Sequence, residues 1–126
     1  MDIEHFYIEK GRGFPLILLH GNGEDCDYFR GQIDEFSKQY HVYAIDTRGH
    51  GRTPRGDMPF TIRQFADDLL EFMDEHQIEK AHLLGFSDGG NIAMVFALQN
   101  PGRIDRLILN GANLNADGVK QTTQLP

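Results

Sequence analysis

Short apolar runs along the chain alternate with segments of helical periodicity. The runs lack the strict apolar–polar alternation of a half-exposed strand. Such continuous apolar runs are typical of strands that are buried on both faces of a parallel sheet. A further segment, residues 5–8, precedes the turn signal Gly11-Arg12-Gly13, and we expect it to be an edge strand in a hairpin with the next run. The four buried runs are residues 16–19, 42–45, 82–86 and 107–109.

Three helices are predicted between the runs. The second opens with a Thr-x-x-Gln capping box, Thr61 and Gln64, behind a proline. The third extends from about Gly90 to Leu98 and ends at Asn100-Pro101-Gly102, because proline cannot continue it. The apolar positions that define the first two helices are Phe29, Ile33, Phe36 and Tyr40, and then Ile62, Phe65, Leu69, Phe72 and His76.

Strands that alternate with helices predict an α/β fold: a mostly parallel sheet with helices on both faces. In such sheets, ligands bind beyond the carboxyl ends of the strands. We therefore expect the loops that begin at His20, Asp46, Ser87 and Asn110 to share one rim of the sheet.

Composition narrows the function classes. The net charge of −7 opposes a phosphate backbone, so we expect no nucleic-acid partner. No apolar stretch has the length of a membrane span, and the first residues are acidic, unlike those of a signal peptide, so the expected location is the cytoplasm. Cys26 is the sole cysteine, and neither metal-ligand spacing nor the need for a cofactor is evident.

The most informative segment is Gly85-Phe86-Ser87-Asp88-Gly89, at the junction of a buried strand and a helix. Gly-x-Ser-x-Gly at such a junction forces a sharp turn that lifts the serine hydroxyl clear of the sheet. The helix N-terminus beneath it favours developing negative charge. Ser87 is therefore the candidate nucleophile; the alternative is a glycine-rich turn with an idle serine.

A second segment complements the first. The loop His20-Gly21-Asn22-Gly23 follows the strand at residues 16–19, and its small residues let backbone N–H groups point toward Ser87. Acyl transfer requires such donors: the N–H of the residue after the nucleophile, Asp88, and one from this loop.

Together these segments resemble the α/β-hydrolase family. The resemblance covers residues 5–113 and implies Ser87 as nucleophile, with Asn22 and Asp88 as backbone donors of the oxyanion hole. It implies esterase-like acyl transfer to water on a small-molecule substrate. The matching segments are residues 20–23, 46–53, 85–90 and 101–109.

The catalytic partners of the serine are missing from this pattern. Family members place an acid and then a histidine after the nucleophile, but all six histidines precede Ser87. His20 and His50, the two near the rim, resemble structural positions of the family. Asp117 is the one candidate acid that follows the last strand at the correct end. Residues 1–126 are thus expected to be the N-terminal half of a hydrolase domain, truncated after about the sixth strand, with the lid and C-terminal half absent.

Two other interpretations remain open. An inert half could self-associate or dock a C-terminal partner, because a last strand with an unpaired edge and uncovered apolar surface favours association. A dinucleotide-binding domain would use Gly21-Asn22-Gly23 and Asp46, but Cys26 replaces the third glycine of that fingerprint, and Glu24 and Asp25 would repel a pyrophosphate.

Overall fold

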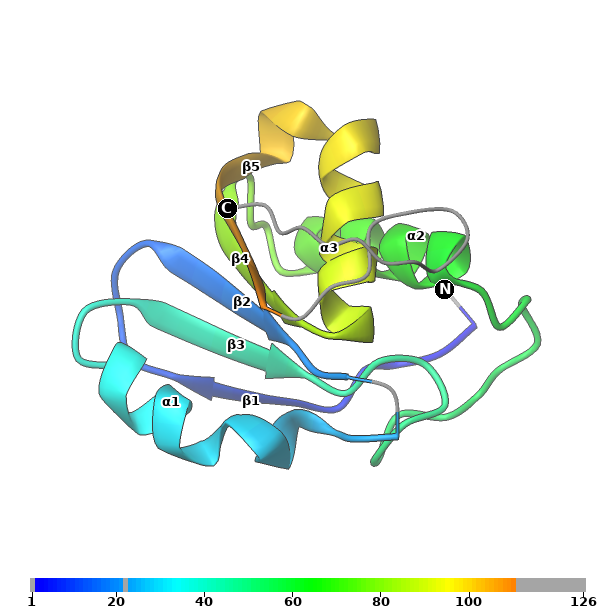
Figure 1. Ribbon diagram of the computed structural model, residues 1–126, viewed down its shortest axis with the longest axis horizontal. Coiled ribbons are helices and arrows are strands. Elements are labelled where there is room, and N and C mark those ends of the chain that lie inside the picture. The colour runs from blue at the N-terminus through cyan, green and yellow to red at the C-terminus, as the bar shows by residue number, and fades with distance from the viewer. Residues whose placement is uncertain (1, 22, 111–126) are drawn as a thin grey trace.

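A five-stranded sheet forms the centre of the computed structural model, which describes residues 2–21 and 23–110. The strands lie in the order β1-β3-β2-β4-β5 (Figure 1). β1 is antiparallel to β3, and every other neighbouring pair is parallel. The mostly parallel α/β architecture is therefore confirmed. The strands are β1 (Tyr7–Lys10), β2 (Pro15–Leu19), β3 (His41–Ile45), β4 (Ala81–Phe86) and β5 (Ile104–Asn110).

The predicted hairpin between the first two strands is wrong. β1 pairs with β3, and β2 lies on the other side of β3. The turn between them packs against the connection that leads into β3: a Cβ on Gly11, at φ +89°, would collide with the carbonyl oxygens of Ser37 and Tyr40. β2 is buried on both faces and needs two neighbours, whereas the half-exposed β1 fits an edge.

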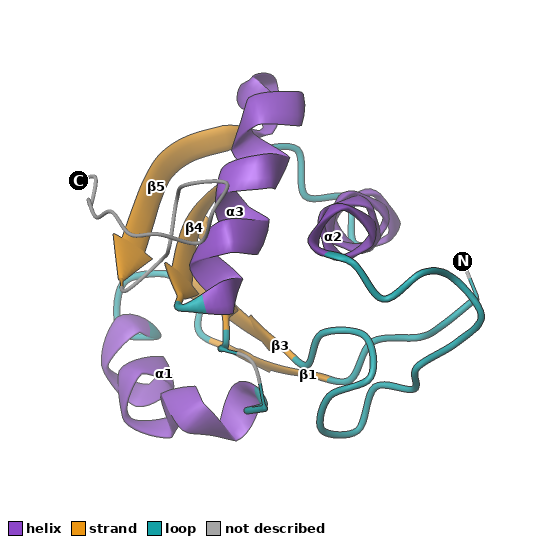
Figure 2. Ribbon diagram, turned by 45° about the vertical axis from the view of Figure 1, so that its right-hand side comes forward, coloured by secondary structure: helices purple, strands orange, loops and turns teal. Residues whose placement is uncertain are grey.

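Helices cover both faces of the sheet (Figure 2). A 3₁₀ turn, Cys26–Phe29, leads into α1 (Arg30–Phe36) on one face. α2 (Ile62–Glu75) and α3 (Asp88–Gln99) cover the other, and a second 3₁₀ turn, Pro101–Arg103, follows α3. Thr61 caps α2, its hydroxyl accepting the Gln64 N–H at 3.1 Å. Among the described residues, no helix combines the length and apolar character needed to cross a bilayer.

Each buried strand divides its side chains between two cores. On β2, Ile17 and Leu19 face α2 and α3, while Leu16 and Leu18 face α1. Phe72 and Phe96 anchor the α2–α3 core and are at most 1% exposed. This division explains why the strand runs are uniformly apolar, since both faces are removed from water.

A buried ion cluster ties the chain's first residues to the loop after β3. The guanidinium of Arg48 is fully buried and donates to both carboxylate oxygens of Asp68, at 2.9 and 2.8 Å. It donates in the same way to Asp2, at 2.9 and 2.7 Å. The Asp2 carboxylate also accepts the backbone N–H of Asp57 at 2.7 Å. These bonds hold the pKa of Asp2 well below its ordinary value.

Replacing Asp68 by Asn should destabilise the fold by about 3 kcal/mol, because it leaves a buried guanidinium with one carboxylate partner. Asp67→Asn, an exposed neighbour on the same helix, is the matched control and should change stability by less than about 0.5 kcal/mol. Urea unfolding of both variants measures the difference. Equal midpoints would show that the ion pair contributes nothing to stability.

His5 is a buried histidine whose ring lacks one hydrogen-bond partner among the described residues. Its Nδ1 is buried with no hydrogen-bond partner among the described residues, and its ring meets that of Phe72 edge-on at 5.6 Å. Burial lowers the pKa of His5 from its ordinary 6.5 to about 4. His82 is the second such case: its buried Nδ1 lies 3.4 Å from Asp105 without forming a hydrogen bond.

Stability should therefore fall as pH decreases from 6.5 to about 4, because the unfolded chain takes up a proton on His5 while the folded protein does not. The loss attributable to this residue is about 3 kcal/mol and is complete below pH 4. Urea unfolding across this range should give a shallower pH dependence for His5→Phe than for the wild type. An unchanged slope would contradict the assignment.

Candidate active site

Ser87 occupies a strained backbone conformation at the end of β4. Its φ of +55° lies in the left-handed region, with Gln77 the only other such non-glycine residue described. Conformations of this kind cost about 1–3 kcal/mol and persist where the surrounding structure enforces them. The Ser87 N–H donates to the Asn110 carbonyl at 2.8 Å, and its own carbonyl accepts the Gly90 N–H at 2.8 Å. These bonds and the start of α3 hold the turn in place.

Close backbone contacts explain the glycines on either side of Ser87. A Cβ on Gly85 would lie 2.6 Å from the Gly90 Cα and would also meet the Gly89 carbonyl. A Cβ on Gly89 would lie 2.6 Å from the His20 carbonyl oxygen and would collide with that of Leu19. β4, α3 and the end of β2 therefore approach one another to a distance that no side chain permits.

The start of α3 lies directly behind Ser87, which is the residue preceding the helix. The first N–H groups of a helix have no intrahelical partner and carry a partial positive charge. Asp88 is the first helical residue, and its side chain accepts from the Asn91 amide at 3.3 Å. The backbone at this point is thus arranged to favour negative charge next to the serine.

The loop after β2 lies against the same serine. The position of a Cβ on Gly21 is 3.2 Å from the Ser87 Cβ and 3.0 Å from a Glu24 carboxylate oxygen. The Gly21 N–H donates to that Glu24 oxygen at 3.1 Å, and the Gly21 carbonyl accepts the Glu24 N–H at 3.2 Å. Asn22, the expected donor in this loop, lies outside the described residues.

His20 orients this loop through both ring nitrogens. The Thr47 N–H donates to Nε2 at 3.1 Å, so the proton resides on Nδ1, which donates to the Gly21 carbonyl at 2.7 Å. The ring is 1% exposed, and burial lowers the pKa of His20. A neutral imidazole with both nitrogens engaged in this way acts on the loop's conformation.

His50 and Asp46 organise the adjacent loop. His50 Nδ1 lies 3.0 Å from the Arg48 carbonyl oxygen and 3.2 Å from the Thr47 hydroxyl. Asp46 is fully buried, and its carboxylate accepts the N–H groups of Cys26 at 2.7 Å and Arg52 at 2.8 Å. Arg48, two residues further on, pairs with Asp2 and Asp68 rather than with Asp46.

Cys26 is the other intrinsically nucleophilic side chain near this rim. It is 1% exposed, and burial, reinforced by Asp46, raises the pKa of its thiol. A protonated, buried thiol is inert as a nucleophile. Within residues 2–21 and 23–110, no three His, Cys, Asp or Glu side chains gather as they would around a metal ion.

The structure thus brings together Ser87, Asp88 and the loop at Gly21. Asp117 lies outside the described residues. Asp105 is near the start of β5, at the opposite end of the sheet, beside His82. Sequence reasoning missed the contact of Glu24 with Gly21, although its signal was present: a glutamate three residues after a loop start is the spacing of a capping box.

Comparison with known proteins assigns the family. A family model described as "alpha/beta hydrolase fold" matches residues 15–124. The chain is 33% identical to (E)-2-((N-methylformamido)methylene)succinate hydrolase of Acinetobacter baylyi over 106 residues, which cover 83% of this chain and 40% of that protein.

Solved structures of hydrolases support the same family assignment. A meta-cleavage product hydrolase from Pseudomonas fluorescens superposes with a TM-score of 0.85 at 36% identity, covering 88% of this chain and 42% of the other. An esterase from a marine microorganism gives a TM-score of 0.81 at 35% identity, covering 85% and 41%. The chain spans less than half the length of these proteins. It belongs to the α/β hydrolase fold family.

Proposed function

We propose that this chain carries the nucleophile and oxyanion-binding half of a serine hydrolase that transfers an acyl group from a small-molecule ester to water. The observation that carries the proposal is the strained Ser87 at the start of α3 with Gly21 against its side chain. Strain at a nucleophile is typical of a site whose geometry is fixed before substrate binds. The esterase and the other hydrolases among the relatives support the reaction class.

In this reaction the Ser87 hydroxyl oxygen attacks the acyl carbon, and its proton passes to a general base. The carbonyl oxygen becomes an oxyanion, for which we propose the backbone N–H groups of Asp88 and Asn22 as donors. Collapse of the intermediate releases the alcohol, and water then hydrolyses the acyl-serine. Removing one such donor typically costs about 10²–10³-fold in rate.

We propose that the histidines on this rim do not supply the general base. Both ring nitrogens of His20 are bonded, to Gly21 and Thr47, and the His50 ring contacts its own loop through Nδ1, which lies 3.0 Å from the Arg48 carbonyl oxygen. We therefore propose that the base, and an acid to orient it, come from outside the described residues, Asp117 being the candidate acid within this chain. An oxyanion site without its base still accelerates reaction by about 10³–10⁴-fold over water.

A fluorophosphonate probe should label the chain once, at Ser87, because the probe's phosphoryl oxygen occupies the oxyanion site. Intact-mass spectrometry measures the labelling. Ser87→Ala should abolish it, and Ser37→Ala, which removes the chain's other serine, should leave it unchanged. Labelling should be slow, because the proposed general base lies outside the described residues. Labelling of the wild type no faster than that of Ser87→Ala would contradict the proposal, and labelling that survives in Ser87→Ala would place the nucleophile elsewhere.

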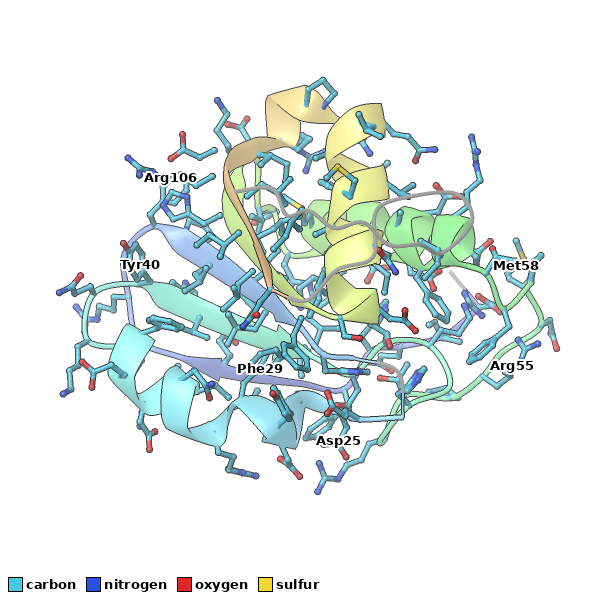
Figure 3. The ribbon with its side chains drawn as sticks, viewed as in Figure 1. Asp25, Phe29, Tyr40, Arg55, Met58 and Arg106 are labelled. Carbon is cyan, nitrogen blue, oxygen red and sulfur yellow. The ribbon has the colours of Figure 1, made fainter. Side chains whose placement is uncertain are left out.

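A second proposal concerns association. An apolar groove of about 210 Å³ lies on the α1 side of the sheet beside β5, lined by Leu84 and Ile108 among others. Ile108 is 49% exposed. Tyr40 and Arg106, both labelled in Figure 3, are also among the groove's lining residues. Exposed apolar surface next to a strand supports docking of a further element, and we propose that a second copy of the chain occupies the groove when no other partner is present.

Sedimentation velocity should accordingly show dimers or larger species whose fraction rises with concentration. Ile108→Glu should shift the chain toward monomer by placing a charge in the groove. Leu98→Glu is the matched control, because Leu98 is exposed on α3, outside the groove. A monomeric wild type would contradict the association.

A further inference from the structure

We propose that Glu24 is a specificity-determining residue that makes this site discriminate against negatively charged substrates. The inference rests on the proposed function, because it assumes that Ser87 is the nucleophile. It concerns a residue whose side chain is part of the loop against Ser87.

Glu24 and Ser87 both lie against Gly21. A Cβ on Gly21 would be 3.0 Å from a Glu24 carboxylate oxygen, 3.2 Å from the Ser87 Cβ and 3.5 Å from a Phe86 ring carbon. The carboxylate and the nucleophile's side chain therefore flank the same glycine. A substrate group that extends from the acyl carbon past Gly21 must pass close to this carboxylate.

The Glu24 carboxylate is held in place by a hydrogen bond. It accepts the Gly21 N–H at 3.1 Å, while the Glu24 N–H donates to the Gly21 carbonyl at 3.2 Å. His20 fixes that carbonyl from the other side, at 2.7 Å. Glu24 is half-buried, so it cannot swing freely into solvent as an exposed glutamate would.

The arginines of the loop after β3 contact other groups. Arg48 is fully buried between Asp2 and Asp68. Arg52 lies over the Phe6 ring at 4.4 Å, and Arg55 over the Phe60 ring at 4.6 Å. Among the residues that the structure describes, Glu24 makes no ion pair, so its charge is not neutralised there.

Apolar surface lies beside the Glu24 carboxylate. The rings of Phe86 and Tyr28 stack at 4.9 Å between centroids, and Tyr28 is 43% exposed. An apolar platform next to an unneutralised carboxylate accepts an uncharged hydrocarbon or aromatic group and repels an anionic one. Partly buried like charges a few ångströms apart repel strongly enough for roughly tenfold discrimination.

The test compares two fluorophosphonate probes, one with a plain alkyl chain and one with the same short chain ending in a carboxylate. The ratio of their labelling rates at Ser87 should favour the neutral probe in the wild type. Glu24→Gln keeps the acceptor for the Gly21 N–H but removes the charge, so the ratio should fall about tenfold. Glu24→Asp keeps the charge and should retain most of the discrimination.

Glu71→Gln is the matched control, because it changes the net charge equally from an exposed position on α2 and should leave the ratio unchanged. An unchanged ratio in a Glu24→Gln protein that still labels would overturn the inference and leave the proposed function standing. Absence of labelling by either probe would overturn both. Should Glu24→Gln not fold, the wild-type ratio decides: it must shrink with ionic strength, and a salt-independent ratio overturns the inference.

Discussion

The contact between Gly89 and the end of β2 is the constraint on which the rest of the site depends. The backbone of α3 touches the backbone at Leu19 and His20 with no side chain between them. This contact holds the helix start against the loop after β2, so that Ser87 and Gly21 meet. The positive φ of Ser87 is the cost of turning the chain from β4 into α3 within so little space.

A polar network extends from that contact into the second loop of the rim. His20 joins the Gly21 carbonyl to the backbone of Thr47, and the Thr47 hydroxyl meets His50. The next residue, Arg48, enters the ion cluster with Asp2 and Asp68. The loops that surround the serine are thus held by bonds to buried or half-buried groups, which is how loops acquire the rigidity that a preorganised site needs.

Much of this arrangement was predictable from the sequence, for local reasons. The strand runs, the Thr61 cap and the Ser87 elbow each depend on residues that are close together in the sequence. Their apolar pattern and glycine spacing can therefore be recognised from the sequence alone. The pairing of β1 with β3 was not predictable in this way. It depends on the packing of the Gly11 turn against residues that are far away in the sequence. The partners of Arg48 were missed for the same reason, since Asp2 and Asp68 lie on opposite sides of it in sequence.

The double anchoring of Arg48 also has a consequence for biosynthesis. Asp2 leaves the ribosome before its ion-pair partner Arg48, and Asp68, the second carboxylate on that guanidinium, follows later still. The carboxylate of Asp2 therefore remains without its ion-pair partner while β1, β2 and β3 are synthesised. Contacts this distant in sequence slow folding, because the loop they close must be ordered first. The ion cluster can thus form only after the segments that carry Arg48 and Asp68 have been synthesised.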